Sequence, residues 1–410
     1  MFRIIRVPAT LDKFFCTLPP CFHWDHCMYF RLLVLVIAMA WGRRNVANLY
    51  RYMDATHHRT RFNNFFLVAR WDPAAALRQK AQELLRALHL GTGETIYVVI
   101  DDSKKAKRGK AMDAVAKLKD PMTEGDIRGH QYVCALLVVR EHVSPWGIRL
   151  YVKPEHAKAL GLPFYKTPEL AGQLIRELKA PAGVTVMVLF DAYYLCHTVV
   201  KACQEKHFHF ASTLKSHRSL FKQSWKLKAG RYGKNLFRRR RRQTCVLAKP
   251  QGVVCYRFVD AGWLEVSKLG QLHGVFSRKG SARKILGLVT DAPALAGAGL
   301  IRTYEKRWAV AQFFKDSKPL LGRGHYQNRP YRAAVTHLHL VCFAYALLTH
   351  LRIERHGAQG QRAHHKAADM SVATAQEALR CLLWDDLVAY LRDKHCGEAV
   401  LAELERLRVA

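Results

Sequence analysis

The chain has 410 residues, with 66 lysines and arginines against 32 aspartates and glutamates, so its formal net charge is +34. Apolar residues make up 50% of the chain and charged residues 24%, which is a globular composition and excludes a disordered, collagen-like or coiled-coil protein. The charge predicts a polyanionic partner, nucleic acid before an anionic membrane, because clustered lysines and arginines gain affinity by displacing phosphate counterions.

The longest apolar run, Leu32 to Trp41, has ten residues. A membrane-spanning helix needs about 20, so we expect a core helix here and no membrane partner. Residues 1–13 lack the basic, apolar and small-residue pattern of a secretory signal, which predicts a cytoplasmic protein. The eleven cysteines fit reduced thiols in that compartment.

A cluster of thiols and imidazoles lies near the N-terminus: Cys16, Cys21, His23, His26 and Cys27. Structural zinc sites combine two close pairs of ligands that are separated along the chain, and these spacings match no such pattern. We expect ordinary thiols and assign no metal.

The first part of the chain is predicted to be helical, with helices at residues 32–41, 45–53, 62–71 and 73–90. Arg43 and Arg44 lie between the first two of these helices. A helix, a short basic turn and a second helix are compatible with docking on DNA, and equally with a solvated surface. We take both arginines as candidate DNA contacts.

An α/β layer follows. Unbroken apolar runs at residues 96–100 and 184–190 are typical of strands buried on both faces. Further strands are predicted at 130–140 and 147–153, and helices at 167–178 and 193–203. Strands and helices in this order predict an α/β fold with a mixed sheet.

Residues 201–250 carry fifteen lysines and arginines against one acid, Glu205. Five arginines follow one another within this segment: Arg238, Arg239, Arg240, Arg241 and Arg242. Aromatic residues are interleaved with the charges: Phe208, Phe210, Phe221, Trp225, Tyr232 and Phe237. A charge run is usually a solvated loop, but this bias together with the aromatics favours binding to a phosphate backbone.

Strands at 253–259, 263–268, 272–277 and 285–290 predict a β-rich insertion in the α/β domain.

Two acids come directly after the two buried runs. Asp102 and Asp191 are candidate metal ligands, because strand ends in α/β sheets face the ligand-binding crevice and carboxylates bind hard metal ions. Asp101 competes with Asp102 for the first position. The alternative is that an Asp after a strand only begins a turn or caps a helix. In a strongly cationic chain, two such acids favour metal-dependent attack on a phosphodiester.

One long helix is predicted at 298–318, followed by helices at 331–351 and 372–391 with a break at 357–360. At about 100° per residue, positions 304, 307, 311 and 318 fall on one stripe. Tyr304, Arg307 and Lys318 then form a polar strip for DNA phosphates. The large side chains of Trp308, Phe313 and Phe314 are predicted to anchor the other sides of the helix in the core.

These residues resemble those of the DDE transposases of bacterial insertion sequences. Tyr304, Arg307 and Lys318 match the family spacing Y-x2-R-x3-E-x6-K of the YREK group, with R-W and F-F inside it. The sequences VVIDDS and VLFDAYY are similar to the strand ends that carry the first two acids of the family, which the resemblance places at Asp102 and Asp191. GRRNVANLYRYM, followed by RFNNFFLVARWDP, resembles the helical domain of one branch, and the resemblance covers about residues 10–350.

The chain departs from the family at its third acid. Ala311 stands where the family has its catalytic Glu, and alanine cannot bind a metal. Gln312, Glu305 and Asp316 lie about 100° to 140° away round the helix. Four explanations stay open: a decayed copy of an element, a deliberate Glu-to-Ala change that traps a DNA complex, a domesticated DNA binder, or an acid supplied from elsewhere.

The resemblance implies a ribonuclease-H-like core in which two Asp and a Glu hold two Mg2+ ions, with Mn2+ as a substitute. It further implies cleavage of double-stranded DNA at element ends, transfer to a target, a homodimer on DNA and a place at the bacterial nucleoid. The expected parts are a helical DNA-binding domain (1–94), the first part of the catalytic core (95–204), a basic β-rich insertion (205–292), the second part of the core with the YREK-type helix (293–352) and a helical tail (353–410). The alternative is a non-catalytic DNA-binding protein of transposase descent. A basic protein associated with RNA would explain the charge but not the two strand-end acids.

Overall fold

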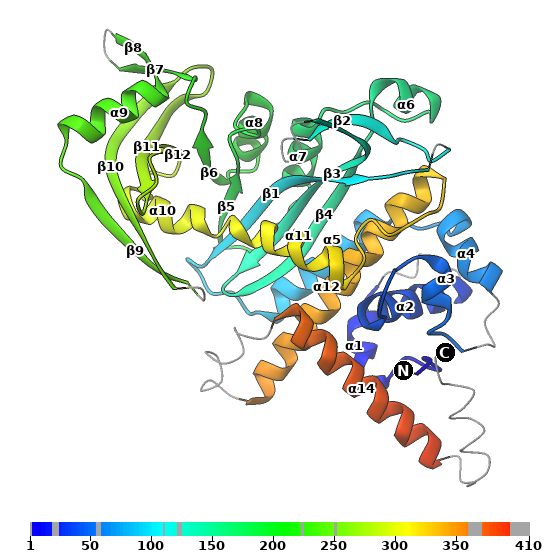
Figure 1. The fold of residues 1–410 in the computed structure, drawn as a ribbon. Coiled ribbons are helices and arrows are strands. Elements are labelled where there is room, and N and C mark those ends of the chain that lie inside the picture. Colours follow the sequence, from blue (N-terminus) through cyan, green and yellow to red (C-terminus); the bar gives the residue numbers. More distant parts are fainter. Residues whose placement is uncertain are drawn as a thin grey trace.

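The computed structural model describes residues 2–18, 24–54, 59–109, 111–120, 125–222, 225–249, 252–359 and 371–393 (Figure 1). The helices are η1 (Ala9–Leu11), α1 (Asp12–Phe15), α2 (Trp24–Met39), α3 (Val46–Tyr50), α4 (Arg59–Val68), α5 (Pro73–Ala87), α6 (Pro154–Ala159), α7 (Thr167–Arg176), α8 (His197–Glu205), α9 (Ala229–Arg239), α10 (Gly297–Glu305), α11 (Trp308–Leu320), α12 (Tyr331–Gln359) and α14 (Val372–Asp393). The strands are β1 (Thr95–Ala106), β2 (Ala116–Asp120), β3 (Gly125–Val139), β4 (His142–Tyr151), β5 (Thr185–Phe190), β6 (His209–Leu214), β7 (Ser219–Lys222), β8 (Trp225–Lys228), β9 (Gln243–Lys249), β10 (Gly252–Val266), β11 (Gly270–Lys279) and β12 (Leu286–Thr290).

All twelve strands belong to one mixed sheet, in the order β2-β3-β1-β5-β6-β12-β11-β10-β7-β8, with β4 paired to β3 and β9 paired to β10. Strand β1 is antiparallel to β3 and parallel to β5, and β5 is parallel to β6. The central strands β1 and β5 contain the predicted buried runs: Val98, Val99 and Ile100 are buried in β1, and residues 186–190 are buried in β5, because helices cover both faces of the sheet. Three antiparallel strands followed by two parallel ones, with helices on both faces, confirm the predicted ribonuclease-H-like α/β fold.

Helices cover both faces of this sheet. Helices α7 and α8 pack on each other, and α7 packs on β3 and β4. On the other face, α11 packs on β1 and β3, and α12 packs on β4. Figure 1 shows α11 crossing the central strands, which places this helix beside the positions of the strand acids.

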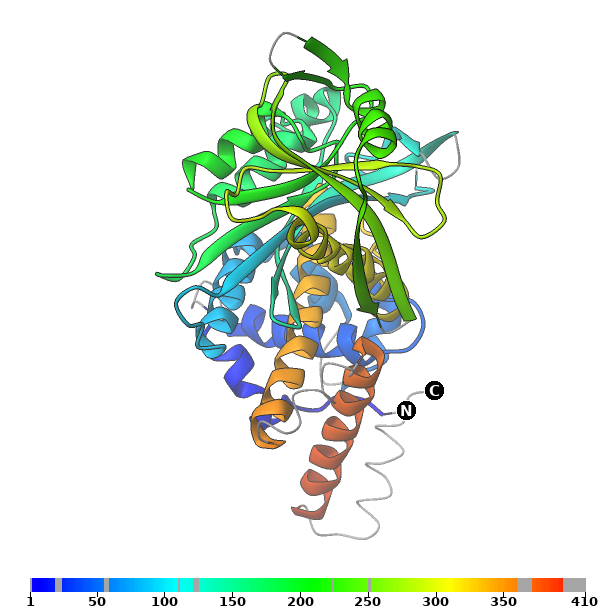
Figure 2. The same cartoon turned by 90° about the vertical axis from the view of Figure 1, so that its left-hand side faces the viewer.

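The N-terminal and C-terminal helices form one helical layer. Helix α12 packs on α2, α5 and α14, and Figure 2 shows these helices gathered below the sheet. The rings of Phe30 in α2 and Phe343 in α12 meet edge to face, with centroids 4.9 Å apart. Residues Tyr331–Glu354 of α12 are long and apolar enough to cross a membrane, but 89% of their apolar window is buried inside the protein. A helix that is apolar on all sides is the core of this layer.

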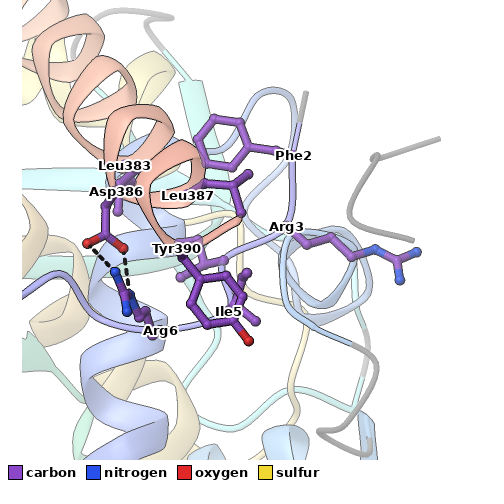
Figure 3. A pocket seen from close by; sticks show the side chains of 9 residues that line it. Phe2, Arg3, Ile5, Arg6, Leu383, Asp386, Leu387 and Tyr390 are labelled. Carbon is purple, nitrogen blue, oxygen red and sulfur yellow. Dashed lines mark hydrogen bonds and ion pairs between the residues drawn. The ribbon is translucent and has the colours of Figure 1, made fainter. Parts of the chain in front are cut away.

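The N-terminal segment docks on α14, so the two ends of the described chain lie together (Figure 3). The guanidinium of Arg6 donates from Nε to Asp386 Oδ2 over 2.9 Å and from Nη2 to Asp386 Oδ1 over 3.1 Å. Its Cζ also lies 5.1 Å from the centre of the Tyr390 ring. The C-terminal tail is therefore held by the first residues of the chain.

Three predicted elements differ from the structure. Strand β10 is continuous where two strands were predicted, because a bulge between Asp260 and Gly262 absorbs the extra residue and Gly262 takes a φ of +70°. Helix α12 extends to Gln359, into the predicted break at 357–360, and Gly360 lies outside the described residues. The helix predicted at 298–318 is two helices, α10 and α11. The β-rich segment continues the main sheet, since β12 pairs with β6.

A candidate active site between β1, β5 and α11

The first candidate acids lie inside β1 and not after it. Strand β1 stays paired with β3 as far as Ala106 and Gly129, whereas its pairing with β5 is formed only as far as Val99 and Leu189. The prediction that the strand stops at these acids was wrong, because the long antiparallel partner β3 carries β1 onward. Asp191 does follow the end of β5, as predicted. The carboxylates therefore lie where the parallel neighbour ends.

Successive residues of β1 face opposite sides of the sheet. Ile100 packs in the core formed with α7 and α8, so Asp102 faces that side. Val99 packs in the core formed with α2 and α12, so Asp101 faces the side on which α11 lies. Two residues beyond the pair Val99–Leu189, the parallel register brings Asp101 beside Asp191.

The surroundings of Asp101 differ from those of an exposed acid. Burial raises its pKa to about 6, with the Arg307 charge acting against the shift and the charges of Asp191 and Asp102 adding to it. The Nη1 of Arg307 donates to Asp101 Oδ2 over 3.0 Å, and the two side chains are 19% and 25% exposed. The Nε of Arg307 is buried without a hydrogen-bond partner. Arg307 therefore partly neutralises Asp101.

Asp102 is held by neutral partners on the other face. Gln131 Nε2 donates to Asp102 Oδ2 over 2.8 Å, and the Tyr194 hydroxyl donates to Asp102 Oδ1 over 3.2 Å. Burial raises the pKa of Asp102. Asp191 Oδ1 accepts from the backbone N–H of Tyr193 over 2.9 Å, so this acid also begins the turn after β5. The alternative that an Asp after a strand only begins a turn therefore accounts for the hydrogen bond of one Asp191 oxygen.

The predicted stripe is broken between α10 and α11. Backbone N–H groups of Lys306 and Arg307 bond three residues back, to Thr303 and Tyr304, which tightens the chain at the junction. Tyr304 is only 9% exposed and burial raises its pKa, so its ring is part of the core. Ala311 lies one turn after Arg307, on the same side of α11.

Two of the predicted core anchors on this segment behave as expected and one does not. Phe313 is fully buried and Phe314 is half-buried, whereas Trp308 is 54% exposed. Trp308 is the first residue of α11, and the tightened junction turns it away from the core. Its predicted anchoring role was wrong.

A group of cations lies further along the same face of β1 as Asp101, around Lys105. Lys105 is on the same face of β1, and burial lowers its pKa, with the charges of Lys318, Arg323 and Arg43 adding to the shift. The structure thus brings two predicted DNA contacts, Arg43 and Lys318, to one place. Lys105 and Arg323 were missed, although spacing of four residues from Asp101 in a strand would have indicated Lys105. Arg323 has no local signal.

Arg44 has a different position from its neighbour Arg43. Its side chain is 4% exposed and donates to the carbonyl oxygens of Gly42, Ala40 and Leu320. Burial lowers its pKa to about 10. A guanidinium used in this way ties the helical domain to α11, and this position does not favour the predicted contact with DNA.

The arginine run lies away from these acids, at the end of α9 and before β9, and all five side chains are exposed. Four of the six aromatic residues around it are buried in the core, and Phe221 is half-buried. Phe208, Phe210, Tyr232 and Phe237 are buried, with at most 8% of each exposed, while the side chain of Trp225 lies outside the described residues. The aromatic spacing was therefore a core pattern, because these rings pack against the sheet.

Oxygen donors are the only metal ligands that these acids offer, which suits a hard cation such as Mg2+. Within the described ranges, no three His, Cys, Asp or Glu side chains converge on one point. Asp101 and Asp191 supply carboxylate oxygens on this side of the sheet, and Ala311 on α11 supplies none. Of the N-terminal thiol and imidazole cluster, Cys21 and His23 lie outside the described residues.

Comparison with known proteins adds the family. The model of the DDE superfamily endonuclease family matches residues 18–257, which is more than half of the chain. The match covers the helical part, β1 and β5 and ends inside β10, before Tyr304, Arg307 and Lys318. No curated protein matches the chain significantly. Members of this family act on DNA and generally use divalent metal ions. The chain belongs to the DDE superfamily endonucleases.

Proposed function

We propose that the protein is a DDE transposase of the YREK group that binds the ends of a bacterial DNA element, and that its third catalytic acid has been replaced by Ala311. The observation that carries the proposal is the ion pair between Arg307 and Asp101. Because this pair ties the start of α11 to Asp101, we assign the third ligand's position to residue 311, one turn further along the helix.

Asp101 and Asp191 would hold the metal. Asp102 is the ligand by resemblance, but it lies on the face of β1 that packs against α7 and α8, opposite the face on which α11 lies. A bound Mg2+, or Mn2+ in its place, would lower the pKa of the attacking hydroxyl and neutralise the leaving oxygen. The remaining residues bind and orient DNA: Arg307 at Asp101, and Lys318 and Arg43 around Lys105, with Tyr304 supporting Arg307 from the core.

The wider assignments are part of the same proposal. Double-stranded DNA supplies both the element ends and the target, and two copies of the chain act together because two ends must be cut. The protein works in the bacterial cytoplasm at the nucleoid. Of the five consecutive arginines, Arg238 and Arg242 contribute phosphate contacts through the basic segment around α9.

A non-catalytic DNA-binding protein is the second candidate, and Ala311 favours it. Neighbouring acids do not replace the missing Glu. Glu305 binds Lys249 and Tyr256, and Asp316 accepts from Gln312 over 2.8 Å. An acid supplied from elsewhere therefore finds no support among the described residues.

A cleavage assay on DNA that carries the flanks of the element, with Mg2+ or Mn2+, separates these functions. The chain is compared with Ala311→Glu and with Ala311→Gln, which matches Glu in size but cannot bind metal as a carboxylate. Cutting by the Glu variant alone supports the proposal. Equal cutting by the unchanged chain would refute the role of position 311. Binding by all three without cutting would favour the DNA-binding protein.

A further inference from the structure

A cationic groove lies beside α9, away from the acids. Its volume is about 810 Å3, and it is lined by the turn at residues 216–217, by residues 228–242 and by the connection from β11 to β12 at residues 278–285. Eight lysines and arginines line it and no acid does. Helix α9 packs on β8, β10 and β12, whereas Asp101 and Asp191 lie at β1 and β5, so other strands of the sheet separate the groove from the acids.

Helix α9 has one face that packs on the sheet and an opposite face that lines the groove. Tyr232, Leu236 and Phe237 are buried against the sheet. Arg231, Lys234 and Arg238 follow at intervals of three and four residues, so they share the opposite face and line the groove. This amphipathic pattern orders the cations side by side on a rigid element.

The charges of the groove cations are not neutralised by acids in the part of the chain that the structure describes. None of the eight groove cations forms an ion pair with a carboxylate in the part of the chain that the structure describes. Arg278 lies 5.4 Å above the Phe237 ring, and its Nε is buried without a hydrogen-bond partner. Eight like charges repel one another, and an anion with several charges would relieve this repulsion.

We propose that the groove binds the phosphate backbone of duplex DNA outside the segment that is cut, an inference that rests on the proposed function. Sites for single strands offer exposed aromatic faces on which bases stack. Among the described lining residues, Phe237 is the one Phe, Tyr or Trp side chain and is 8% exposed beneath Arg278, while His217 adds a single exposed imidazole. Cations without stacking surfaces fit a double helix, whose bases are already stacked.

The groove divides the arginine run. Arg238 and Arg242 line it, whereas Arg239, Arg240 and Arg241 do not, and Arg240 Nη1 points to the carbonyl oxygen of Asp260 over 3.4 Å. The run therefore contains a matched control. Arg231→Gln/Lys234→Gln/Arg238→Gln removes three groove charges, and Arg239→Gln/Arg240→Gln/Arg241→Gln removes the same charge from beside the groove.

The test is the salt dependence of binding to a random-sequence duplex, measured by fluorescence anisotropy. Each lost phosphate contact lowers the slope of log K against log salt by about 0.9, so the groove variant should lose about 2.7. At about 0.1 M salt this is about a 500-fold loss of affinity, if the lines meet at about 1 M. The control variant should lose less than about 1 in slope. Circular dichroism melting of both variants establishes that they fold.

Other results overturn the inference. Equal losses in the two variants would show that only the overall charge matters. A larger loss for a single strand of the same length than for the duplex would assign the groove to single strands. If the unchanged chain binds duplex DNA and the groove variant has the same slope, the role of the groove is refuted and the proposed function is not. Failure of the unchanged chain to bind any duplex would refute the proposed function itself.

Discussion

The ion pair between Arg307 and Asp101 can be tested without knowing the DNA substrate. Arg307→Met removes the guanidinium and keeps much of the side-chain volume, and Asp101→Asn removes the charge of the acid. With the double variant, these proteins form a cycle that isolates the interaction between the two side chains. The quantity that we predict is the coupling free energy of unfolding.

The magnitude follows from the partial burial of the pair. Exposed ion pairs contribute about 0.2–1 kcal/mol, and removing one partner of a fully buried pair costs about 3–5 kcal/mol. The two side chains are 19% and 25% exposed, at an N–O distance of 3.0 Å. We therefore expect a coupling of about 1–2 kcal/mol at about pH 8.

The pH dependence supplies the second part of the prediction. The pKa of Asp101 is about 6 in the folded protein against an ordinary value of 3.8, so folding favours its protonated form. Ionised Asp101 thus lowers stability above pH 6, and this loss is relieved as the pH falls from 6 towards 3.8. The attraction to Arg307 exists only while Asp101 is ionised, so the coupling should shrink between about pH 8 and pH 5.

Urea unfolding of the four proteins at both pH values measures the coupling. A coupling below about 0.3 kcal/mol at the higher pH would show that solvent screens the pair. The same coupling at both pH values would show that Asp101 does not titrate near 6. Either result would refute the account of this site.

Two further predictions concern stability near the acids. Gly129→Ala in β3 places a Cβ 2.1 Å from the carbonyl oxygen of Lys105, so urea unfolding should show a loss of stability of about 2–4 kcal/mol. Gly299→Ala is the control: its Cβ meets only Leu295 at 3.5 Å, so stability should change by less than about 1 kcal/mol. Equal effects of the two substitutions would contradict the close approach of β1 and β3. Burial lowers the pKa of Lys107 from 10.5 to about 7, so between these pH values the unfolded chain binds a proton at this lysine that the folded protein lacks. The stability of the unchanged chain relative to Lys107→Met should therefore rise from about pH 7 to pH 10. A stability difference that does not change with pH would exclude the lowered pKa.

Much of the fold follows from local pattern. The runs at β1 and β5 are apolar throughout because both faces are covered, and their position is readable without a structure. How far β1 continues depends on β3, which is a tertiary pairing. The break between α10 and α11 also leaves no mark in the sequence, since neither proline nor glycine lies at residues 305–308.

The site shows the same division. The sequence identifies two adjacent acids, Asp101 and Asp102, but only the packing of Val99 and Ile100 decides which face each one takes. Interleaved aromatic and basic residues around α9 are equally the pattern of an amphipathic helix and of a base-stacking surface. Burial of Phe237 against the sheet decides for the helix.

The central claim is that Asp101 and Asp191 form a metal site that a carboxylate at position 311 would complete. Crystals of Ala311→Glu soaked in Mn2+ test it directly through the anomalous signal of the metal. The account predicts a peak within about 2.1–2.3 Å of oxygens of Asp101, Asp191 and Glu at position 311, and a weaker or absent peak in the unchanged chain. A peak bound to Asp102 beside Gln131, or no peak with Glu present, would contradict it.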